Sequence, residues 1–539
     1  MIQMRKIGLI LLITLAVLCG LGVLAFSFAE NWVNKNLPVI LNSNPERRYD
    51  VLFEKVQFDF FKRVILIEDV KIRPFGDQVG TVARAEVHQA FLSQIDPMKL
   101  FLKKDLSIGD LMFLEPHFRV YFSSDSVGQD QAGDALQGLF GDLLSRGQIS
   151  NFQVGRANAE FFREDSLIGS ISDLNIIATD LVTDSIKLSN PIPFDYGRVR
   201  IALDRLQYRM DNGQNLDVGE VKFDTQKSEI KILGGFSMKY HEEVQNLAKR
   251  LPYQQDLVEV EMDSLIFSGL EANANLYSDL DVRSQKLQVF GLDLRDFRDK
   301  SRPRAPEPVK PMFQGLIQQI NFPIRLDTLE LIDGKITYGE TVPNSGAQWD
   351  IHFDQLNGII TKLTTIPEFQ RQYGMVEAKF EGKLEGQSKI NFQLTVPFDE
   401  DVFKLKAELS RFNLTGLNAI LKPVMNGDIV DGRLDRLKLE LAATATGADA
   451  TLYFDYADLK VELFKKGTQK RSRLKSALAN LVINTSNLSG DKNYNIPSYR
   501  VVRDQHRGPF HLIWNSTKEG IMQVVPSGVA QGLLKPSEK

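Results

Sequence analysis

Histidines are the first residues to examine for chemistry, because they serve as general bases and as zinc ligands. The six histidines of this 539-residue chain form no HExxH motif and no other zinc-spaced pair. We therefore interpret them as surface or structural residues, and we expect no metal site. They are His88, His117, His241, His352, His506 and His511.

Other catalytic signatures are also missing from the sequence. No GxSxG elbow, phosphate-binding Walker A loop or EF-hand loop occurs, and the 69 acidic residues are spread along the chain as solvated faces require. The single cysteine, Cys19, excludes an internal disulfide and a cysteine-ligated metal centre. The net charge of −4 argues against a nucleic-acid partner. We expect neither an enzyme nor a bound cofactor.

An uncharged run from Ile7 to Ala29 follows Arg5 and Lys6 near the N-terminus. It is long enough to cross a bilayer as a helix, and longer than the apolar part of most cleaved signals. The basic residues place the N-terminus in the cytoplasm by the positive-inside rule. We expect residues 1–40 to form a cytoplasmic stub and a single-pass anchor, with the bulk of the chain across the membrane. A cleaved signal peptide is the alternative.

Beyond the anchor, apolar residues alternate with polar ones over most of the chain. Examples are VLFEKVQFDFF from Val51, RVILIEDVKI from Arg63 and KINFQLTVPF from Lys389. This period of two is typical of strands with one buried face, and long helices between the strands are not evident. The pattern predicts a mainly β fold with a mostly antiparallel sheet.

One six-residue phrase occurs four times, with an aspartate at its second position and apolar residues at its first, fourth and sixth. The copies are LDRLQY from Leu203, MDSLIF from Met262, LDTLEL from Leu326 and LDRLKL from Leu434. We expect the aspartate to lie at a turn and the following apolar residues to begin the buried face of a strand.

Short amphipathic helices are predicted before three of these phrases and before a looser relative, ISNFQV. The segments are DALQGLFGDLLSR from Asp134, HEEVQNLAKRL from His241, MFQGLIQQI from Met312 and LTGLNAILKPVM from Leu414. In addition, ISNFQVGRANAEFF from Ile149 aligns without gaps with LDTLELIDGKITYG from Leu326. Self-similarity of this kind indicates a repeated unit.

A proline-rich stretch at 299–311 reads as a semi-rigid linker or a surface loop. It would divide the β region into a first part, 41–298, and a second part, 312–464. The C-terminal segment, 465–539, begins with basic residues and ends with apolar ones.

The strands would add side by side into an elongated, curved sheet whose apolar concave face forms a groove for acyl chains. The alternative is that these apolar residues face the core of a closed β-sandwich. The predicted groove residues are Leu206, Tyr208, Leu265, Phe267, Leu329, Leu331, Leu437 and Leu439. Phe510, Leu512, Ile513 and Trp514 are predicted to contact a distal membrane or a partner, with a terminal helix that caps the sheet as the alternative.

Three segments resemble the AsmA-like family of inner-membrane-anchored periplasmic proteins, which are related to TamB and to chorein-type bridge-like lipid-transfer proteins. They are RRYDVLFEKVQFDFFKRVILIEDVKIRP, LNAILKPVMNGDIVDGRLDRLKLEL and YFDYADLKVELFKK. The resemblance implies a periplasmic β-groove and a role in phospholipid transport between the envelope membranes, or in their homeostasis. The expected partners are phospholipid or another acyl-chain lipid, the inner membrane, and an outer-membrane or envelope protein. The alternative function is a scaffold that assists outer-membrane protein assembly by β-augmentation.

Overall fold

A computed structural model describes residues 27–43, 47, 49–76, 81–104, 106–122, 149–181, 197–271, 281–306, 309–343, 346–419, 427–463 and 482–526. It is mainly β, with 59% strand and 16% helix. Ladders of backbone hydrogen bonds join the described strands into one sheet of 24 strands. The predicted fold class is confirmed at this level.

The chain divides into two compact units. Unit 1 comprises Met1–Asp211, Leu216–Ile232 and Ala272–Asp279, and unit 2 comprises Asn212–Asn215, Leu233–Glu271 and Leu280–Lys539. The predicted division at 299–311 does not coincide with this boundary, because that stretch lies within unit 2. There Lys310 bonds to the backbone of Gln505, and Arg304 forms an ion pair with Asp504. The stretch is therefore a loop tied to unit 2.

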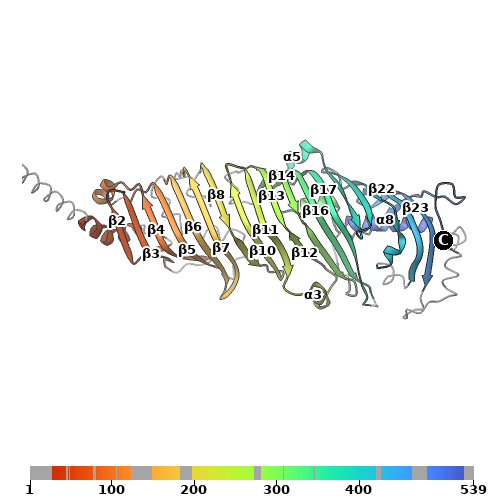
Figure 1. The fold of residues 1–539 in the computed structure, drawn as a ribbon, viewed down its shortest axis with the longest axis horizontal. Coiled ribbons are helices and arrows are strands. Elements are labelled where there is room, and N and C mark those ends of the chain that lie inside the picture. Colours follow the sequence, from red (N-terminus) through yellow and green to blue (C-terminus); the bar gives the residue numbers. More distant parts are fainter. Residues whose placement is uncertain are drawn as a thin grey trace, which may run out of the picture. The chain divides into compact units, whose positions relative to one another are not determined.

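The strands of unit 1, together with β10 and β11 that carry residues of both units, are neighbours in Figure 1. They are β1 (Tyr49–Leu52), β2 (Lys55–Asp59), β3 (Val64–Pro74), β4 (Val82–Ser93), β5 (Asp110–Phe122), β6 (Asn151–Arg163), β7 (Ser166–Thr179), β8 (Arg198–Leu203), β9 (Arg205–Arg209), β10 (Gln214–Asp224) and β11 (Glu229–Tyr240).

The remaining strands belong to unit 2. They are β12 (Asp256–Met262), β13 (Ser264–Leu270), β14 (Val282–Phe290), β15 (Asp293–Asp299), β16 (Ile324–Thr341), β17 (Gln348–Thr364), β18 (Met375–Leu384), β19 (Ser388–Pro397), β20 (Phe403–Leu409), β21 (Phe412–Asn413), β22 (Gly427–Thr444), β23 (Gly447–Leu463) and β24 (Ser498–Val502).

Helices are few and short, and two of the four predicted ones are confirmed. They are α3 (Val244–Arg250) and α4 (Phe313–Gln318). The segment from Leu414 begins as the 3-10 helix Leu414–Leu417, and the segment from Asp134 lies outside the described residues. Further helical elements are residues 27–41, the π-helix Lys99–Lys103, α5 (Pro367–Tyr373) and α8 (Pro509–Val524).

Most ladders are antiparallel, as the sequence predicts. The parallel exceptions all involve β6 or β16. β5 pairs in parallel with β6, and both β14 and β15 pair in parallel with β16. A parallel pair needs a crossover connection, and α4 lies in the crossover that leads to β16. β6 and β16 are the two strands that the sequence alignment paired without gaps.

The two aligned strands also share a bulge. Arg156 in β6 and Asp333 in β16 occupy equivalent positions of the alignment, and both have a positive φ, 53° and 54°. The backbone N–H of each donates to an asparagine side chain on the following strand, Asn175 or Asn357. An extra residue in one strand bends a sheet and increases its twist. The two aligned segments therefore share a backbone feature as well as an apolar pattern.

The aspartates of the repeated phrase occupy two kinds of position. Asp204 and Asp263 lie at bends between consecutive short strands, β8/β9 and β12/β13. Because β8 and β9 pair with β7 in one continuous register, Asp204 marks a break in a strand and not the predicted turn. Asp327 and Asp435 lie inside the long strands β16 and β22, so the predicted turn is wrong for them. There Asp435 accepts a hydrogen bond from Arg433 at i−2, and Asp327 forms an ion pair with Arg325 at i−2. The positive charge of the arginine compensates the aspartate, so the carboxylate can be accommodated inside a strand.

Among the described residues, no helix is long and apolar enough to cross a membrane. The predicted anchor falls on Ile7–Ala29, of which residues 7–26 lie outside the described part of the chain.

Candidate functional site

Unit 2 has an apolar face that continues from strand to strand in cross-strand register. We call its two central lines row 1 and row 2. Row 1 consists of Phe267, Leu287, Leu329, Ile360, Ala378, Leu394, Leu405, Leu441, Ala450 and Tyr499. Row 2 consists of Leu265, Val289, Leu331, Gly358, Phe380, Phe392, Ala407, Leu439 and Leu452.

The predicted groove residues of unit 2 lie together on this face. Phe267 and Leu329 belong to row 1, and Leu265, Leu331 and Leu439 belong to row 2. Leu437 lies one row further, opposite Leu409. Their accessibility differs: Leu439 is 1% exposed and Leu265 and Leu331 are buried, whereas the other three are half-buried.

Unit 1 has an apolar face of the same kind. Its row 3 consists of Val56, Ile67, Ala90, Phe113, Val154, Ile176, Ile201 and Phe223. Its row 4 consists of Val51, Ile72, Ala85, Phe118, Ala159, Ile171 and Leu206. The predicted residue Leu206 therefore extends row 4. Tyr208 lies beside it on the same face, opposite Gly169.

α8 covers the apolar face of unit 2 at β23 and β24 (Figure 1). Its residues Leu512 and Val524 are buried, and Gly520 lies against Leu452 and Tyr499. The predicted distal residues thus have two orientations. Leu512 and Ile513 pack onto the hydrophobic cluster of unit 2, whereas Phe510 and Trp514 are 68% and 56% exposed. The helix caps the sheet with one side, as in the alternative interpretation.

The helix at residues 27–41 packs on the apolar cluster of unit 1 at β2, where its Asn34 donates to the backbone carbonyl of Val56. Val33, Leu37 and Ile40 of this helix are buried in the same hydrophobic cluster as rows 3 and 4. The exposed fraction of Ile65 and of Ala83 is 0%, whereas Ile176, Ile201 and Phe223 are half-buried. In both units, therefore, the face is closed in some strands and more accessible in others.

Large half-buried side chains of rows 1 and 2 are concentrated between β13 and β19. They are Phe267, Leu329, Ile360, Phe380, Phe392 and Leu394. An apolar side chain that is only partly removed from water still gains free energy when another apolar group covers it. This part of unit 2 is the surface on which an acyl chain would bind most favourably.

One carboxylate interrupts the apolar face of unit 2. Asp296 lies in register with Val258 of β12 and Tyr338 of β16, and its Oδ1 atom is buried with no hydrogen-bond partner. Burial, together with the neighbouring carboxylates of Asp256 and Glu340, raises the pKa of Asp296 to about 7 against the opposing charge of Arg298. The carboxyl is therefore close to half-protonated at neutral pH.

Apart from Val258, the groups named around Asp296 are charged or polar. Arg298 binds Asp256 through two nitrogens, Lys300 forms an ion pair with Glu340, and the Tyr338 hydroxyl donates to Glu340. Burial and the neighbouring Glu340 carboxylate raise the pKa of Tyr338. The apolar alternation of this strand breaks at DLRDFRD, and that break was the available sequence signal for the cluster.

Much of the opposite face of the sheet in unit 2 is polar, apart from the apolar cluster that Leu257 and Phe297 form with α3. Ion pairs join neighbouring strands there, such as Lys286 with Glu330 at 2.8 Å and Arg436 with Asp455 at 3.0 Å. Such exposed pairs contribute little to stability, typically below about 1 kcal/mol each. Their main consequence is that water wets much of this face, whereas the face of rows 1 and 2 stays apolar from strand to strand.

No family model matches the chain, and no curated protein is significantly similar to it. Among the described residues there is no cluster of three or more side chains that would hold a metal ion. The candidate site is therefore defined by its geometry: a continuous apolar surface, partly covered by helices, with one polar cluster on it.

Proposed function

We propose that this chain is an inner-membrane-anchored periplasmic protein of the AsmA-like kind. It binds lipid acyl chains along its apolar face and contributes to phospholipid transport between the envelope membranes, or to their homeostasis. The observation that best supports this proposal is the register of rows 1 and 2. It keeps apolar residues or glycine side by side across ten strands in row 1 and nine in row 2. An elongated, curved groove is part of this proposal.

A long apolar surface suits acyl chains better than it suits polar ligands. Each methylene removed from water contributes about 0.8 kcal/mol, so a chain of some sixteen carbons gains affinity without directional contacts. Because the rows make no directional contacts, neighbouring positions are equivalent for an acyl chain. The acyl chain can therefore slide along the face. Headgroups would remain at the wet edge of the face.

The test compares two double variants that change adjacent residues of the same strands. Phe267→Asp with Ile360→Asp places charges on row 1, and Ile266→Asp with Ile359→Asp places them on the opposite face of β13 and β17. A carboxylate facing an acyl chain must be desolvated. We expect the first variant to retain at least about tenfold less phospholipid, measured by native mass spectrometry of the detergent-extracted protein.

The control variant should retain lipid as the wild type does. Circular dichroism establishes that both variants are folded, and the milder Phe267→Asn serves if the double variant is not. Equal phospholipid retention by folded row-1 and control variants would refute lipid binding on this face.

Exposed apolar residues and lysines in unit 1 support attachment to a membrane surface. Ring contacts link Trp32 of the helix at 27–41 to Phe101, Phe58, Phe60 and Phe61 in turn. At the exposed side of this aromatic chain, Phe61, Met98 and Leu102 are 88%, 70% and 75% exposed. The exposed lysines beside them are Lys62, Lys99, Lys103 and Lys104. Apolar anchors flanked by lysines are typical of membrane interfaces.

A probe at Leu102 tests this contact. In a Cys19→Ser background, an environment-sensitive fluorophore on Leu102→Cys should shift to the blue after reconstitution of the full chain into vesicles of phosphatidylethanolamine and phosphatidylglycerol. Spin-labelled lipid should quench it. Leu167→Cys, in a 50% exposed strand residue of the same unit, should show neither effect. Identical spectra at both sites would contradict the proposed contact.

The scaffold alternative requires a sheet edge that pairs with a client strand. The described outer strands are short: β1 and β2, which pair with successive parts of β3, have four and five residues, and β24 has five, so each offers few backbone groups for pairing. Co-purification separates the two functions, since bound phospholipid supports the first and unfolded barrel protein supports the second.

A further inference from the structure

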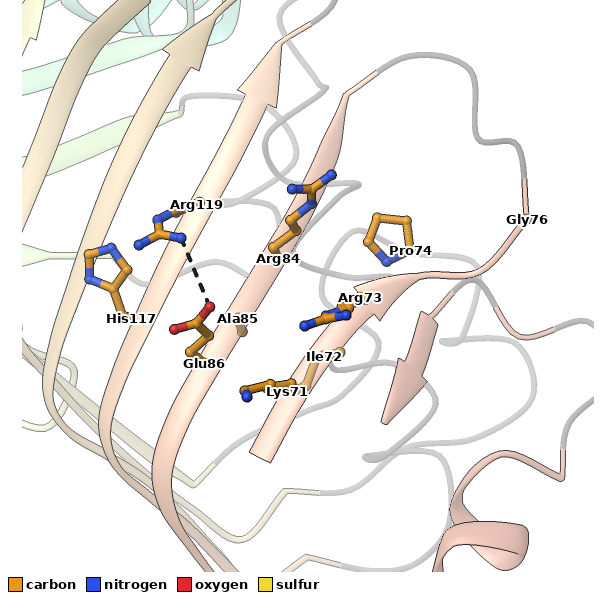
Figure 2. A pocket seen from close by; sticks show the side chains of 10 residues that line it. All are labelled: Lys71, Ile72, Arg73, Pro74, Gly76, Arg84, Ala85, Glu86, His117 and Arg119. Carbon is orange, nitrogen blue, oxygen red and sulfur yellow. Dashed lines mark ion pairs between the residues drawn. The ribbon is translucent and has the colours of Figure 1, made fainter. Parts of the chain in front are cut away.

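Three arginines lie side by side on the polar face of unit 1. Arg84 of β4 is opposite Arg119 of β5, and the register that places Ile72 opposite Ala85 places Arg73 of β3 opposite Arg84. We call them the arginine row; Figure 2 shows them on the same side of their strands. Like charges in directly opposed positions of a sheet are destabilising. The arginine row therefore lowers the stability of the protein when no ligand is bound.

Elsewhere on the polar face of unit 1, opposite charges meet. Arg205 binds Asp217 through two nitrogens, Arg198 binds Asp224 in the same way, and Lys55 lies 3.3 Å from Glu68. The arginine row breaks this rule. A break in charge pairing at exposed residues points to a ligand that supplies the missing negative charge.

Neighbouring carboxylates pair with Arg119 but form no described ion pair with Arg73 or Arg84. Asp50 lies opposite Arg73 but binds Arg47 at 2.6 Å, and Glu54 pairs with Lys71. Arg119 has two carboxylates within reach, Glu160 at 3.4 Å and Glu86 at 3.9 Å. Glu160 is shared with His117 at 3.0 Å.

Arg73 and Arg84 form no ion pair within the described part of the chain. Both are exposed, and the guanidinium of Arg84 lies over the Tyr121 ring, 5.3 Å from its centroid. Tyr121 in turn stacks on Phe162 with ring centroids 5.1 Å apart. The Arg84 guanidinium is thereby held in place, while its donors stay free to bind a ligand.

A hollow of about 450 Å³ lies above these residues (Figure 2). Its charged or titratable lining consists of Lys71, Arg73, Arg84, Glu86, His117 and Arg119. The planar guanidinium fork matches the oxygens of a phosphate group and binds them bidentately. The volume exceeds that of a phosphate group, so the hollow also has room for the substituent of a phosphate ester.

We propose that the arginine row binds a phosphate group, with Arg73 and Arg84 as its main donors. The site lies on the polar face, opposite rows 3 and 4, and does not depend on lipid binding by the apolar face. The phosphate belongs either to a phospholipid headgroup or to a soluble phosphate ester.

The test uses the full chain in detergent and compares thermal unfolding in phosphate with unfolding in chloride at equal ionic strength. Wild type should unfold at a higher temperature in phosphate. The variant Arg73→Gln with Arg84→Gln should lose this difference and should unfold in chloride at or above the wild-type temperature, because the repulsion is relieved. Arg205→Gln removes an exposed arginine that is already paired, and should keep the phosphate effect.

Calorimetry identifies the source of the phosphate. The double variant should bind the effective probe at least about tenfold more weakly than wild type. Tighter binding of dihexanoyl phosphatidylglycerol than of glycerol 3-phosphate assigns a lipid headgroup, and equal or weaker binding assigns a soluble ester. The proposal is overturned if wild type binds neither probe, or if the double variant binds them as wild type does. Lipid retention by row 1 remains a separate measurement, so the two proposals fail independently.

Discussion

Replacing Gly520 by valine is expected to lift α8 from the sheet and to lower the free energy of unfolding by about 3 kcal/mol. A Cβ atom at this position would lie 2.3 Å from the Tyr499 hydroxyl and 2.7 Å from the nearest methyl carbon of Leu452. Leu452 has an exposed fraction of 0%, so it has no room to move away. The Tyr499 hydroxyl donates to the carbonyl of Ser516 at 2.6 Å and would lose this bond as well.

Helix propensity alone predicts the opposite sign. Valine is better than glycine inside a helix by a few tenths of a kcal/mol. The packing penalty is several times larger, so the sign of the measured change decides whether α8 is seated on the apolar face. Denaturation followed by Trp514 fluorescence gives the free energy, and hydrogen exchange of residues 509–524 locates the change.

Glu519→Val is the control, because Glu519 is exposed on the same helix. Its effect should stay within about 0.5 kcal/mol. Gly520→Val should also bind more of a hydrophobic dye, since α8 covers the end of rows 1 and 2 at β23 and β24. Equal stability of the two variants would show that α8 does not pack as described.

The alternation of apolar residues predicted which residues of a strand share a face. It did so for Phe267, Leu329 and Leu437, because the period of two is set within each strand. It could not predict that Phe267 and Leu329 fall in one row, since β13 and β16 are joined through β14 and the parallel pairing follows from a crossover. The degree of burial also could not be predicted from the sequence, since Leu439 lies on the same face and is nearly inaccessible to solvent.

The repeated phrase illustrates the same limit. Its aspartate is compatible with a bend, as at Asp263, and with a strand interior where an arginine lies two residues before it, as at Asp435. The local sequence does not determine whether the aspartate lies at a bend or inside a strand. The length of the hydrogen-bond ladder with the partner strand determines it. The gapless alignment succeeded because β6 and β16 repeat a bulge as well as an apolar pattern.

The charged groups of the two faces were the least predictable. Arg73, Arg84 and Arg119 are 11 and 35 residues apart in sequence and become neighbours only through the register of β3, β4 and β5. A single sequence without the register contains no trace of this contact. Asp296 differs, because the loss of alternation around it was visible.

Replacing Asp296 by asparagine is expected to stabilise the protein at pH 8 and to change little at pH 4. An aspartate in an unfolded chain has a pKa near 3.9, whereas burial raises that of Asp296 to about 7. Between these values the folded state holds a proton that the unfolded state has released. Stability contributed by this group therefore falls as the pH rises from about 4 to about 7, and is constant above.

The size of the effect follows from the shift. One pKa unit corresponds to about 1.36 kcal/mol, and Asp296 is not fully buried, so the expected gain for Asp296→Asn at pH 8 is about 2–4 kcal/mol. Asparagine keeps the shape and removes the charge beside Asp256 and Glu340. Arg298, Lys300 and Tyr338 keep their carboxylate partners, because these bonds are to Asp256 and Glu340 and not to Asp296.

Asp435→Asn is the matched control with the opposite sign. The Arg433 guanidinium holds the pKa of Asp435 below its usual value, so this carboxylate contributes stability above the unfolded pKa and loses it as the pH falls through the folded pKa. Asp435→Asn should therefore destabilise at pH 8 and have no effect in strong acid. Unfolding midpoints of both variants and wild type between pH 4 and pH 8 give the comparison.

A gain for Asp296→Asn that is the same at pH 4 and pH 8 would mean that the carboxyl is not the titrating group. If the gain grows with pH as expected, protonation of one side chain removes the charge that interrupts the apolar face between β12 and β16. The face then becomes more apolar as the pH falls below 7. Under the proposed function, acyl-chain retention by the wild type should rise over the same range, while retention by Asp296→Asn should not depend on pH.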